Sequence, residues 1–393
     1  NGQKANVPKL RFPGFEGEYV EFRIGEIYAE RSERGEPEKE LLSVTQNDGV
    51  VPRSEIDGKN NASEDRSNYK VVRVGDMVYN SMRMWQGANG ISSLDGIVSP
   101  AYTVLYPRTE IVNGYFSVLF KTPGLINEFR KNSQGLTSDT WNLKYPQISR
   151  IRVYIPSVQE QRKIAELLSR LDARIEAQRQ LIEAIKKYKR GVMQHIFSSS
   201  SSKAWGCVRL GNIFKKVSRR NTDGKIKNVI TNSAEYGLIP QREFFDKDIA
   251  VEGNTSNYYV IETGDFVYNP RKSNTAPYGP FNRYTLGDSG IISPLYTCLV
   301  LQTDVDPSYL AWYFKSDVWH RYIYDNGSQG VRHDRVSMTD DLLMGIPIAV
   351  PPSDKQKQIT QMLDTIEARL LAAQSEYALL EKVQKGFMKQ LFI

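Results

Sequence analysis

The residue types that carry out catalysis are present in this chain, but their spacing forms no catalytic motif. The sequence contains no phosphate-binding loop, no dinucleotide-binding glycine pattern and no nucleophile elbow. The three histidines, His195, His320 and His333, lie far apart, which disfavours a metal site. We therefore expect no catalytic residue, no metal and no cofactor in this chain.

One tetrapeptide needs separate treatment because it is similar to a motif of amino methyltransferases. The stretch Asp-Pro-Ser-Tyr at 306–309 lacks the second proline of that motif, and no glycine-rich cofactor loop precedes it. Asp306 stands directly before a helix-like run, where an aspartate commonly caps the first turn. We predict a structural role for Asp306 as a helix N-cap.

Composition indicates an ordinary globular protein with its charge unevenly placed. Of the 393 residues, 40% are hydrophobic and 25% charged, which allows two or three domains with real cores. Two cysteines are too few for a disulfide framework, so we expect free thiols in a cytoplasmic protein without a membrane partner. Much of the net charge of +7 lies in 156–197, around Lys186, Lys187, Lys189 and Arg190.

The chain is an internal repeat. The phrase "NYKVVRVGDMVYN" (68–80) returns as "NYYVIETGDFVYN" (257–269), and "GIVSPAY" (96–102) returns as "GIISPLY" (290–296). Between these phrases the second copy is five residues longer, and the inserts do not repeat. Such a pattern fits one scaffold that presents two different reading surfaces, although duplication followed by neutral loop drift would also produce it.

Each copy consists of a mixed body and a long helix. We predict a first body at 1–155, a helix at 156–197, a linker with the second body at 198–350, and a second helix at 351–393. The bodies alternate short β-branched runs with turn signals and helix-like segments, which predicts an α+β fold with a mostly antiparallel or mixed sheet. The linker begins with a serine tract, which indicates a flexible connection.

Apolar residues repeat at steps of four and three along both helices, which predicts coiled-coil packing of one helix on the other. The alternative is that each helix packs only on its own body. Gln178, Lys189 and Gln384 interrupt the seam as polar positions. The seam residues are Ile164, Leu168, Leu171, Ile175, Ile182, Ile185, Ile359, Leu363, Ile366, Leu370, Tyr377 and Leu380.

These features together resemble the specificity subunit of type I restriction-modification systems. The resemblance rests on "IPSVQEQRKIAELLSRLD" (155–172), on "PKLRFPGFEGEY" (8–19), on the helix endings "GVMQHIF" and "GFMKQLF", and on the repeat, and it covers nearly the whole chain. The second helix departs from the pattern with "KQKQI" (355–359), where a Glu-Gln pair is usual.

The resemblance implies a fold and a set of partners. Two target-recognition domains would be joined by two long helices that form an antiparallel coiled coil with pseudo-twofold symmetry. Each domain would read one half of a bipartite, asymmetric site in double-stranded DNA, and the coiled coil would set the gap. Two adenine-N6 methyltransferase subunits that carry S-adenosylmethionine would dock on the chain, and restriction-translocase subunits would join them.

Residue types that suit base and phosphate contacts lie in the variable inserts and in two further paired loops. Arginine suits guanine, and asparagine or glutamine suits adenine, in the major groove. The candidate base readers are Thr45, Gln46, Asn47, Ser81, Arg83, Trp85, Gln86, Asn89, Gln134, Thr137, Ser138, Thr231, Asn232, Arg271, Lys272, Ser273, Asn274, Tyr278, Arg283, Gln329, Arg332, His333 and Arg335. The candidate phosphate contacts are Arg31, Arg34, Lys215, Lys216, Arg219 and Arg220.

Two other interpretations remain at this stage. A duplicated protein-binding scaffold on a coiled-coil spacer would bind no DNA even beside a methyltransferase. A methyltransferase with degenerate motifs would bind S-adenosylmethionine by itself. The sequence does not give the bases read, the gap length, or which body reads which half-site.

Overall fold

A computed structural model describes residues 6–46, 48–57, 62–136, 141–198, 205–241, 255–327 and 334–393. The chain divides into two units, which we call unit 1 (Asn1–Gln180 with Ser375–Ile393) and unit 2 (Leu181–Gln374). Each unit contains one copy of the repeated body and parts of both long helices.

The centre of unit 1 is a four-stranded antiparallel sheet with the strand order β2-β9-β6-β7. Met77 and Tyr79 of β6 pack in one hydrophobic cluster and Val78 in another, because successive side chains point to opposite faces of the sheet. The strands are β1 (Val20–Arg23), β2 (Tyr28–Glu30), β3 (Leu42–Val44), β4 (Val50–Pro52), β5 (Lys70–Val72), β6 (Met77–Asn80), β7 (Asn89–Ile91), β8 (Gly96–Val98), β9 (Tyr102–Pro107) and β10 (Arg152–Ile155).

Unit 2 repeats this topology with the order β12-β19-β16-β17. Phe266 and Tyr268 of β16 pack in one cluster and Val267 in the other, as in β6. The strands are β11 (Gly206–Arg209), β12 (Phe214–Lys216), β13 (Ile230–Ser233), β14 (Gly237–Pro240), β15 (Tyr259–Ile261), β16 (Phe266–Tyr268), β17 (Phe281–Arg283), β18 (Gly290–Ile292), β19 (Thr297–Leu301) and β20 (Pro347–Val350). The predicted internal repeat is therefore confirmed at the level of strand order.

The repeated phrases at 96–102 and 290–296 begin with the tightly packed strands β8 and β18. A Cβ added at Gly96 would lie 2.6 Å from the side chain of Leu42, and one added at Gly290 would lie 2.4 Å from the side chain of Ile230. Any larger residue would therefore push β8 away from β3, or β18 away from β13. Close strand packing explains why the glycine is kept in both copies.

The helix-like segments of both bodies are helical but broken in two. Thr122 precedes α3, and its buried hydroxyl donates a hydrogen bond to the carbonyl of Leu119. Pro123 is the first residue of α3, a position that proline favours. Asp306 accepts hydrogen bonds from the backbone N–H groups of Ser308 and Tyr309, which confirms the predicted N-cap. The short helices are α1 (Ile24–Ile27), η1 (Arg53–Glu55), η2 (Met84–Gln86), α2 (Asn113–Leu119), α3 (Pro123–Asn132), α4 (Tyr145–Ile148), α7 (Leu210–Ile213), α9 (Pro307–Lys315), α10 (His320–Asn326) and α11 (Asp340–Met344).

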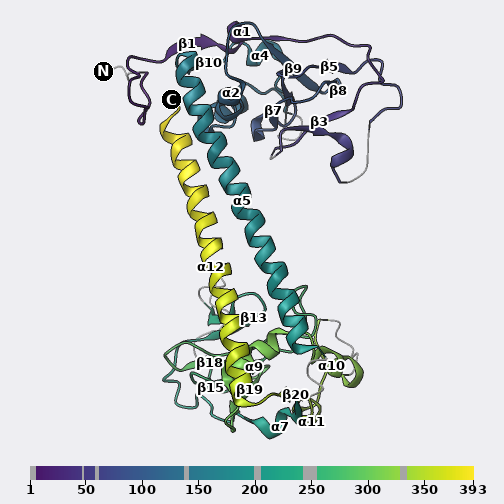
Figure 1. The fold of residues 1–393 in the computed structure, drawn as a ribbon, viewed down its shortest axis with the longest axis vertical. Coiled ribbons are helices and arrows are strands. Elements are labelled where there is room, and N and C mark those ends of the chain that lie inside the picture. Colours follow the sequence, from purple (N-terminus) through teal and green to yellow (C-terminus); the bar gives the residue numbers. More distant parts are fainter. Residues whose placement is uncertain are drawn as a thin grey trace. The chain divides into compact units, whose positions relative to one another are not determined.

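Two long helices, α5 (Val158–Phe197) and α12 (Ser353–Gln390), follow the proline-marked ends of the bodies. In unit 1 the first half of α5 runs antiparallel to the last turns of α12 (Figure 1), since Asp172 bonds Gln384 and Arg174 bonds Glu376. In unit 2 the equivalent bond joins Lys189 to Glu367 at 2.5 Å. At the repeat offset of 195, Asp172 corresponds to Glu367 and Gln384 to Lys189. Two of the polar interruptions of the seam, Lys189 and Gln384, are thus paired across the helices.

Residues at the ends of the helix seam also pack in the hydrophobic cores of the two bodies. Ile164 and Leu168 join the unit 1 cluster, and Ile359, Leu363 and Ile366 join the unit 2 cluster. Ile182 and Leu370 are buried, whereas Leu171, Ile175, Ile185, Tyr377 and Leu380 are partly buried. The helices therefore pack on the bodies and on each other, so the two packing alternatives are not exclusive.

The N-terminal segment closes unit 1. Arg11 donates two hydrogen bonds of 2.9 and 2.8 Å to the buried carboxylate of Glu160 on α5, and the Leu10 N–H donates to the carbonyl of Gln390 on α12. Tyr19 also donates to Glu160. The residue equivalent to Glu160 in the second copy is Lys355, which is exposed. This difference explains the departure of "KQKQI" from the first helix start.

Candidate nucleic-acid interface

In unit 1 the variable insert and the loop after α3 are joined by backbone and ring contacts. The Leu143 N–H donates to the carbonyl of Ser81 at 2.8 Å, and the rings of Trp85 and Trp141 meet edge to face at 5.3 Å between centroids. Two loops that the sequence predicted separately therefore form one surface.

Unit 2 joins the corresponding loops in the same way. The Val336 N–H donates to the carbonyl of Pro270, and the Lys272 N–H donates to the carbonyl of Asp334, each at 2.8 Å. Arg271 and Arg335 face each other as an isolated β-bridge. In each unit the variable insert is therefore bonded to the loop that follows the second of two short helices, which is α3 in unit 1 and α10 in unit 2.

The third predicted loop lies beside the insert in both units. In unit 2 the Asn232 side chain donates to the carbonyl of Val267 at 2.8 Å and accepts from Asn282 at 2.7 Å. In unit 1 the hairpin turn at Gly49, next to the third loop, packs closely against Gly90 of the insert. A Cβ added at Gly90 would lie 2.8 Å from the Gly49 Cα. Each unit therefore gathers all three candidate loops.

Three predicted base readers are not presented to a ligand, which corrects the sequence-based assignment. Ser81 is buried with its hydroxyl 2.8 Å from that of Thr103, and Asn89 is buried with its amide on the carbonyl of Gly87. Asn232 is buried in the bonds described above. A buried polar side chain needs partners inside the protein, so these residues shape the loops instead.

The other predicted readers divide by exposure. Those exposed are Gln46, Arg83, Gln134, Arg271, Ser273 and Asn274. Those partly buried are Thr45, Trp85, Gln86, Thr231, Lys272, Tyr278, Arg283 and Arg335. Asn47, Thr137, Ser138, Gln329, Arg332 and His333 lie outside the described residues.

Two of the predicted phosphate contacts are engaged inside the protein, which is a second correction. Arg31 donates to the buried carboxylate of Asp76 through Nε at 2.7 Å and Nη2 at 3.0 Å, and this bond raises the pKa of Arg31. Arg219 bonds Asp265, the equivalent aspartate of the second copy. Both aspartates follow the glycine of a repeated Gly-Asp turn, so the two arginines hold that turn against the sheet.

The remaining phosphate candidates lie at the surface. Arg34 donates to Asn68, and Arg220 stacks over the ring of Tyr259 at 4.5 Å. Lys216 pairs with Asp340, and Lys215 is exposed on β12. A phosphate contact therefore remains a prediction for these four residues.

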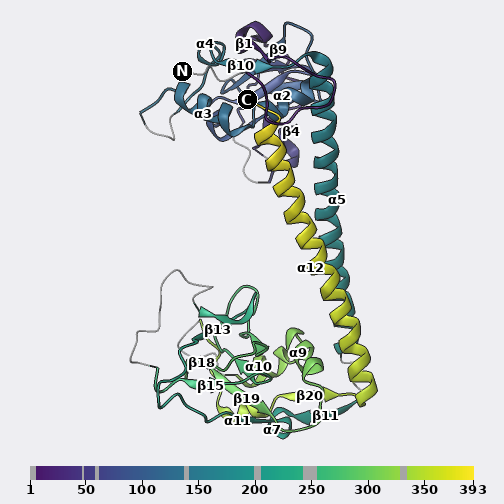
Figure 2. The same ribbon diagram turned by 90° about the vertical axis from the view of Figure 1, so that its left-hand side faces the viewer.

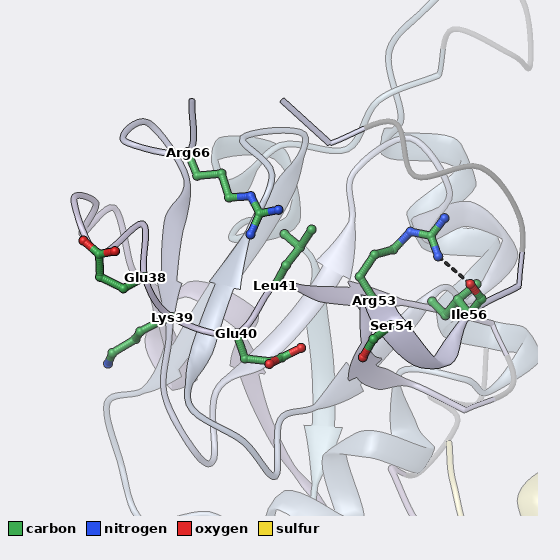
Figure 3. A pocket seen from close by; sticks show the side chains of 8 residues that line it. All are labelled: Glu38, Lys39, Glu40, Leu41, Arg53, Ser54, Ile56 and Arg66. Atoms are coloured by element: carbon green, nitrogen blue, oxygen red, sulfur yellow. Dashed lines mark hydrogen bonds between the residues drawn. The ribbon is translucent and has the colours of Figure 1, made fainter. Parts of the chain in front are cut away.

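Unit 1 carries two neighbouring cavities, one of which is lined in part by the insert. One, of about 600 Å³, is lined by Asn80, Arg83 and Tyr102 among others. The other, of about 450 Å³, contains Arg53 and Arg66 (Figure 3), and Arg53 lines both. Arg53 donates to the Ile56 carbonyl at 2.6 Å. Sequence reasoning missed Arg53 and Arg66 because they fall outside the repeated phrases and the inserts.

A sequence model of the type I restriction modification DNA specificity domain matches residues 16–187, which include all of the loops of unit 1 described above. Residues 16–187 are thus similar to the type I DNA specificity domain. A Methanocaldococcus jannaschii protein described as a putative specificity subunit of the type I restriction enzyme MjaX is 22% identical over an alignment of 370 residues, and the alignment covers 84% of this chain and 80% of that protein.

Solved structures of type I specificity subunits share the fold over the whole chain. The HsdS subunit from Thermoanaerobacter tengcongensis has a TM-score of 0.50 at 17% identity, and 97% of each chain is covered. The S subunit from M. genitalium has a TM-score of 0.53 at 12% identity, with 98% of this chain and 99% of that chain covered. The type I specificity-subunit fold is therefore the fold of this chain. Within the described residues, no helix combines the length and apolarity that a membrane span requires.

Proposed function

We propose that this chain is the non-catalytic specificity subunit of a type I restriction-modification complex. Each unit reads one half of a bipartite, asymmetric site in double-stranded DNA, and the paired helices set the gap between the half-sites. The observation that carries the proposal is the convergence of the same three loops in both units, where the framework repeats and the exposed loop residues differ.

The exposed residues of the loops are of the right types for base recognition. Unit 1 presents Arg83 and Gln134, and unit 2 presents Arg271 and Asn274. Arginine forms a bidentate contact with guanine, and glutamine or asparagine does so with adenine. Because the two sets differ, two units of one fold would select two different half-sites.

Catalysis is assigned to partner subunits. Two adenine-N6 methyltransferase subunits dock on the paired helices and supply S-adenosylmethionine, and restriction-translocase subunits join them to cleave unmethylated DNA. This chain contributes the choice of site, in the cytoplasm, and binds no cofactor. The target-recognition domains are residues 1–155 and 198–350, and the helices between and after them are the docking segments.

The proposal is tested by co-expression with the neighbouring methyltransferase in a host without adenine methylation, followed by genome-wide mapping of N6-methyladenine. The expected result is one split motif with two short half-sites and a fixed unspecified gap. If a methyltransferase that co-purifies with the chain leaves no such marks, the proposal is wrong, and a protein-binding scaffold becomes the better account.

A further inference from the structure

Unit 2 contains a cavity of about 710 Å³ at the junction between its body and the long helices. The β13-β14 hairpin, β17 and α9 form its body side. The helices α9 and α12 are labelled in Figure 2, and Trp312 of α9 donates to Asp364 of α12. Its helix side comes from the basic stretch of α5 and from α12. The side chains that matter for charge are Lys189, Arg283, Lys315, Glu235, Asp364 and Glu367.

The cations of the cavity are arranged around one tryptophan. The ammonium groups of Lys189 and Lys315 lie 5.2 and 4.4 Å from the centroid of the Trp312 ring. Trp312 is held in place by its Nε1, which donates to Asp364 at 2.8 Å. Arg283 lines the same cavity and donates through Nη1 to the Ser308 hydroxyl at 3.1 Å.

The cavity lining carries three basic side chains, Lys189, Arg283 and Lys315, and three acidic ones, Glu235, Asp364 and Glu367. Glu367 is taken up by Lys189 at 2.5 Å, and Asp364 accepts from Trp312. Within the described part of the chain, Lys315 and Arg283 have no ion-pair partner, and the buried Nε of Arg283 has no acceptor. Burial lowers the pKa of Lys315 and the charge of Lys189 adds to this, whereas the carboxylates of Glu367 and Asp364 oppose it. The cavity therefore offers a ligand the unpaired Nε–H of Arg283 and the ammonium group of the exposed residue Lys315.

The repeat shows that the scaffold does not require this cluster. Strand pairing and the repeat offsets place Ile91, Val118 and Gln384 of the first copy where the second has Arg283, Trp312 and Lys189. Lys315 alone is retained, as Lys121. The first copy keeps the fold with neutral residues at these places, so the two cations and the aromatic ring are specific to the second copy.

We propose that this cavity binds a phosphate group of the DNA backbone next to the half-site read by unit 2. Lysine and arginine N–H groups converging from different elements suit a tetrahedral oxyanion. Asn282 and Tyr236 from the candidate recognition loops line the same wall, so DNA held on those loops passes the mouth of the cavity. The inference rests on the proposed function, and it assigns a register-setting contact to one unit only.

The test measures binding of the chain–methyltransferase complex to a duplex that carries the mapped motif, over a range of salt concentrations. Lys315→Gln is expected to flatten the plot of log affinity against log salt by about 0.9, because one phosphate contact is lost. Lys121→Gln removes the equivalent lysine of unit 1 and is expected to leave the slope unchanged. Arg283→Gln serves as the second variant and should flatten the slope in the same way.

The possible outcomes distinguish failure of this inference from failure of the proposed function. An unchanged slope in both the Lys315 and Arg283 variants, with wild-type complex still binding the motif, overturns the inference and leaves the proposed function intact. Wild-type complex that does not bind the motif overturns both. Inorganic phosphate that protects unit 2 from thermal unfolding in a Lys315-dependent way, while the DNA slope stays unchanged, would assign the site to a free anion and refute the DNA contact.

Discussion

The ion pair between Arg31 and Asp76 gives the sharpest stability prediction. Arg31→Gln removes two hydrogen bonds, of 2.7 and 3.0 Å, from a carboxylate that is 3% exposed, and leaves it the Arg73 N–H at 2.8 Å. Removing one partner of a buried pair costs about 3–5 kcal/mol. Because the Arg73 bond remains, we expect the lower end, about 3 kcal/mol.

A loss of that size is large against a total stability of about 5–15 kcal/mol. For a unit of this size it corresponds to a fall in Tm of roughly 6–12 °C. Differential scanning calorimetry or urea unfolding of the purified chain measures it. Arg31→Gln combined with Asp76→Asn should recover much of the loss, because no unpaired charge stays buried.

The same variant separates a structural arginine from a DNA contact. Arg31→Gln is expected to leave the salt dependence of DNA binding by the complex unchanged, whereas Arg34→Gln should flatten it by about 0.9 without changing Tm. A flattened salt slope with unchanged Tm for Arg31→Gln would refute the reasoning and restore Arg31 as a phosphate contact.

Three further predictions concern packing and reactivity. Glu160→Ala should destabilise unit 1 by about 3 kcal/mol in urea unfolding, because it leaves Arg11 without its buried partner, while Lys355→Ala at the equivalent exposed position should have no measurable effect. Leu363→Ala, in the unit 2 core, should cost about 2–5 kcal/mol in the same assay; a smaller loss would show that this helix does not pack on the body. Cys207 should react with a thiol reagent at pH 8 in the native chain and Cys298 only after unfolding, since burial raises the pKa of Cys298 to about 12; equal rates would contradict its burial.

The sequence could predict the architecture because its signals are repeated. The strand phrases, the proline boundaries and the four-three apolar steps occur twice at nearly constant offset, and each corresponds to an element of the structure. Gly96 and Gly290 were visible as part of a repeated phrase, although only the structure gives the packing reason.

The corrections at the candidate interface have a common cause. Arg31 directly follows β2, whereas Arg219 lies two residues further along the chain after the equivalent strand β12, yet both reach the aspartate of the Gly-Asp turn. An alignment of the two copies matches Arg219 with Glu33 and hides this equivalence. Ser81 and Asn89 have the residue types of base readers, but a sequence does not show which side of a loop faces inward.

Long-range pairs were also beyond the sequence. The bond between Arg11 and Glu160 joins residues 149 positions apart. A glutamate in the first turn of a polar helix does not indicate which distant residue it will bond, so this pair could not be predicted. The cavity of unit 2 draws on five separate elements, so none of its residues could be grouped by spacing alone.

The central claim is that each unit reads one half-site independently, and mapping the methylated motif of loop variants tests it most directly. Arg83→Ala with Gln134→Ala in unit 1, and Arg271→Ala with Asn274→Ala in unit 2, would each be co-expressed with the methyltransferase. The account predicts that each pair relaxes or changes one half of the motif while the other half and the gap stay constant. Changes in both halves from one pair, or an altered gap, would contradict it.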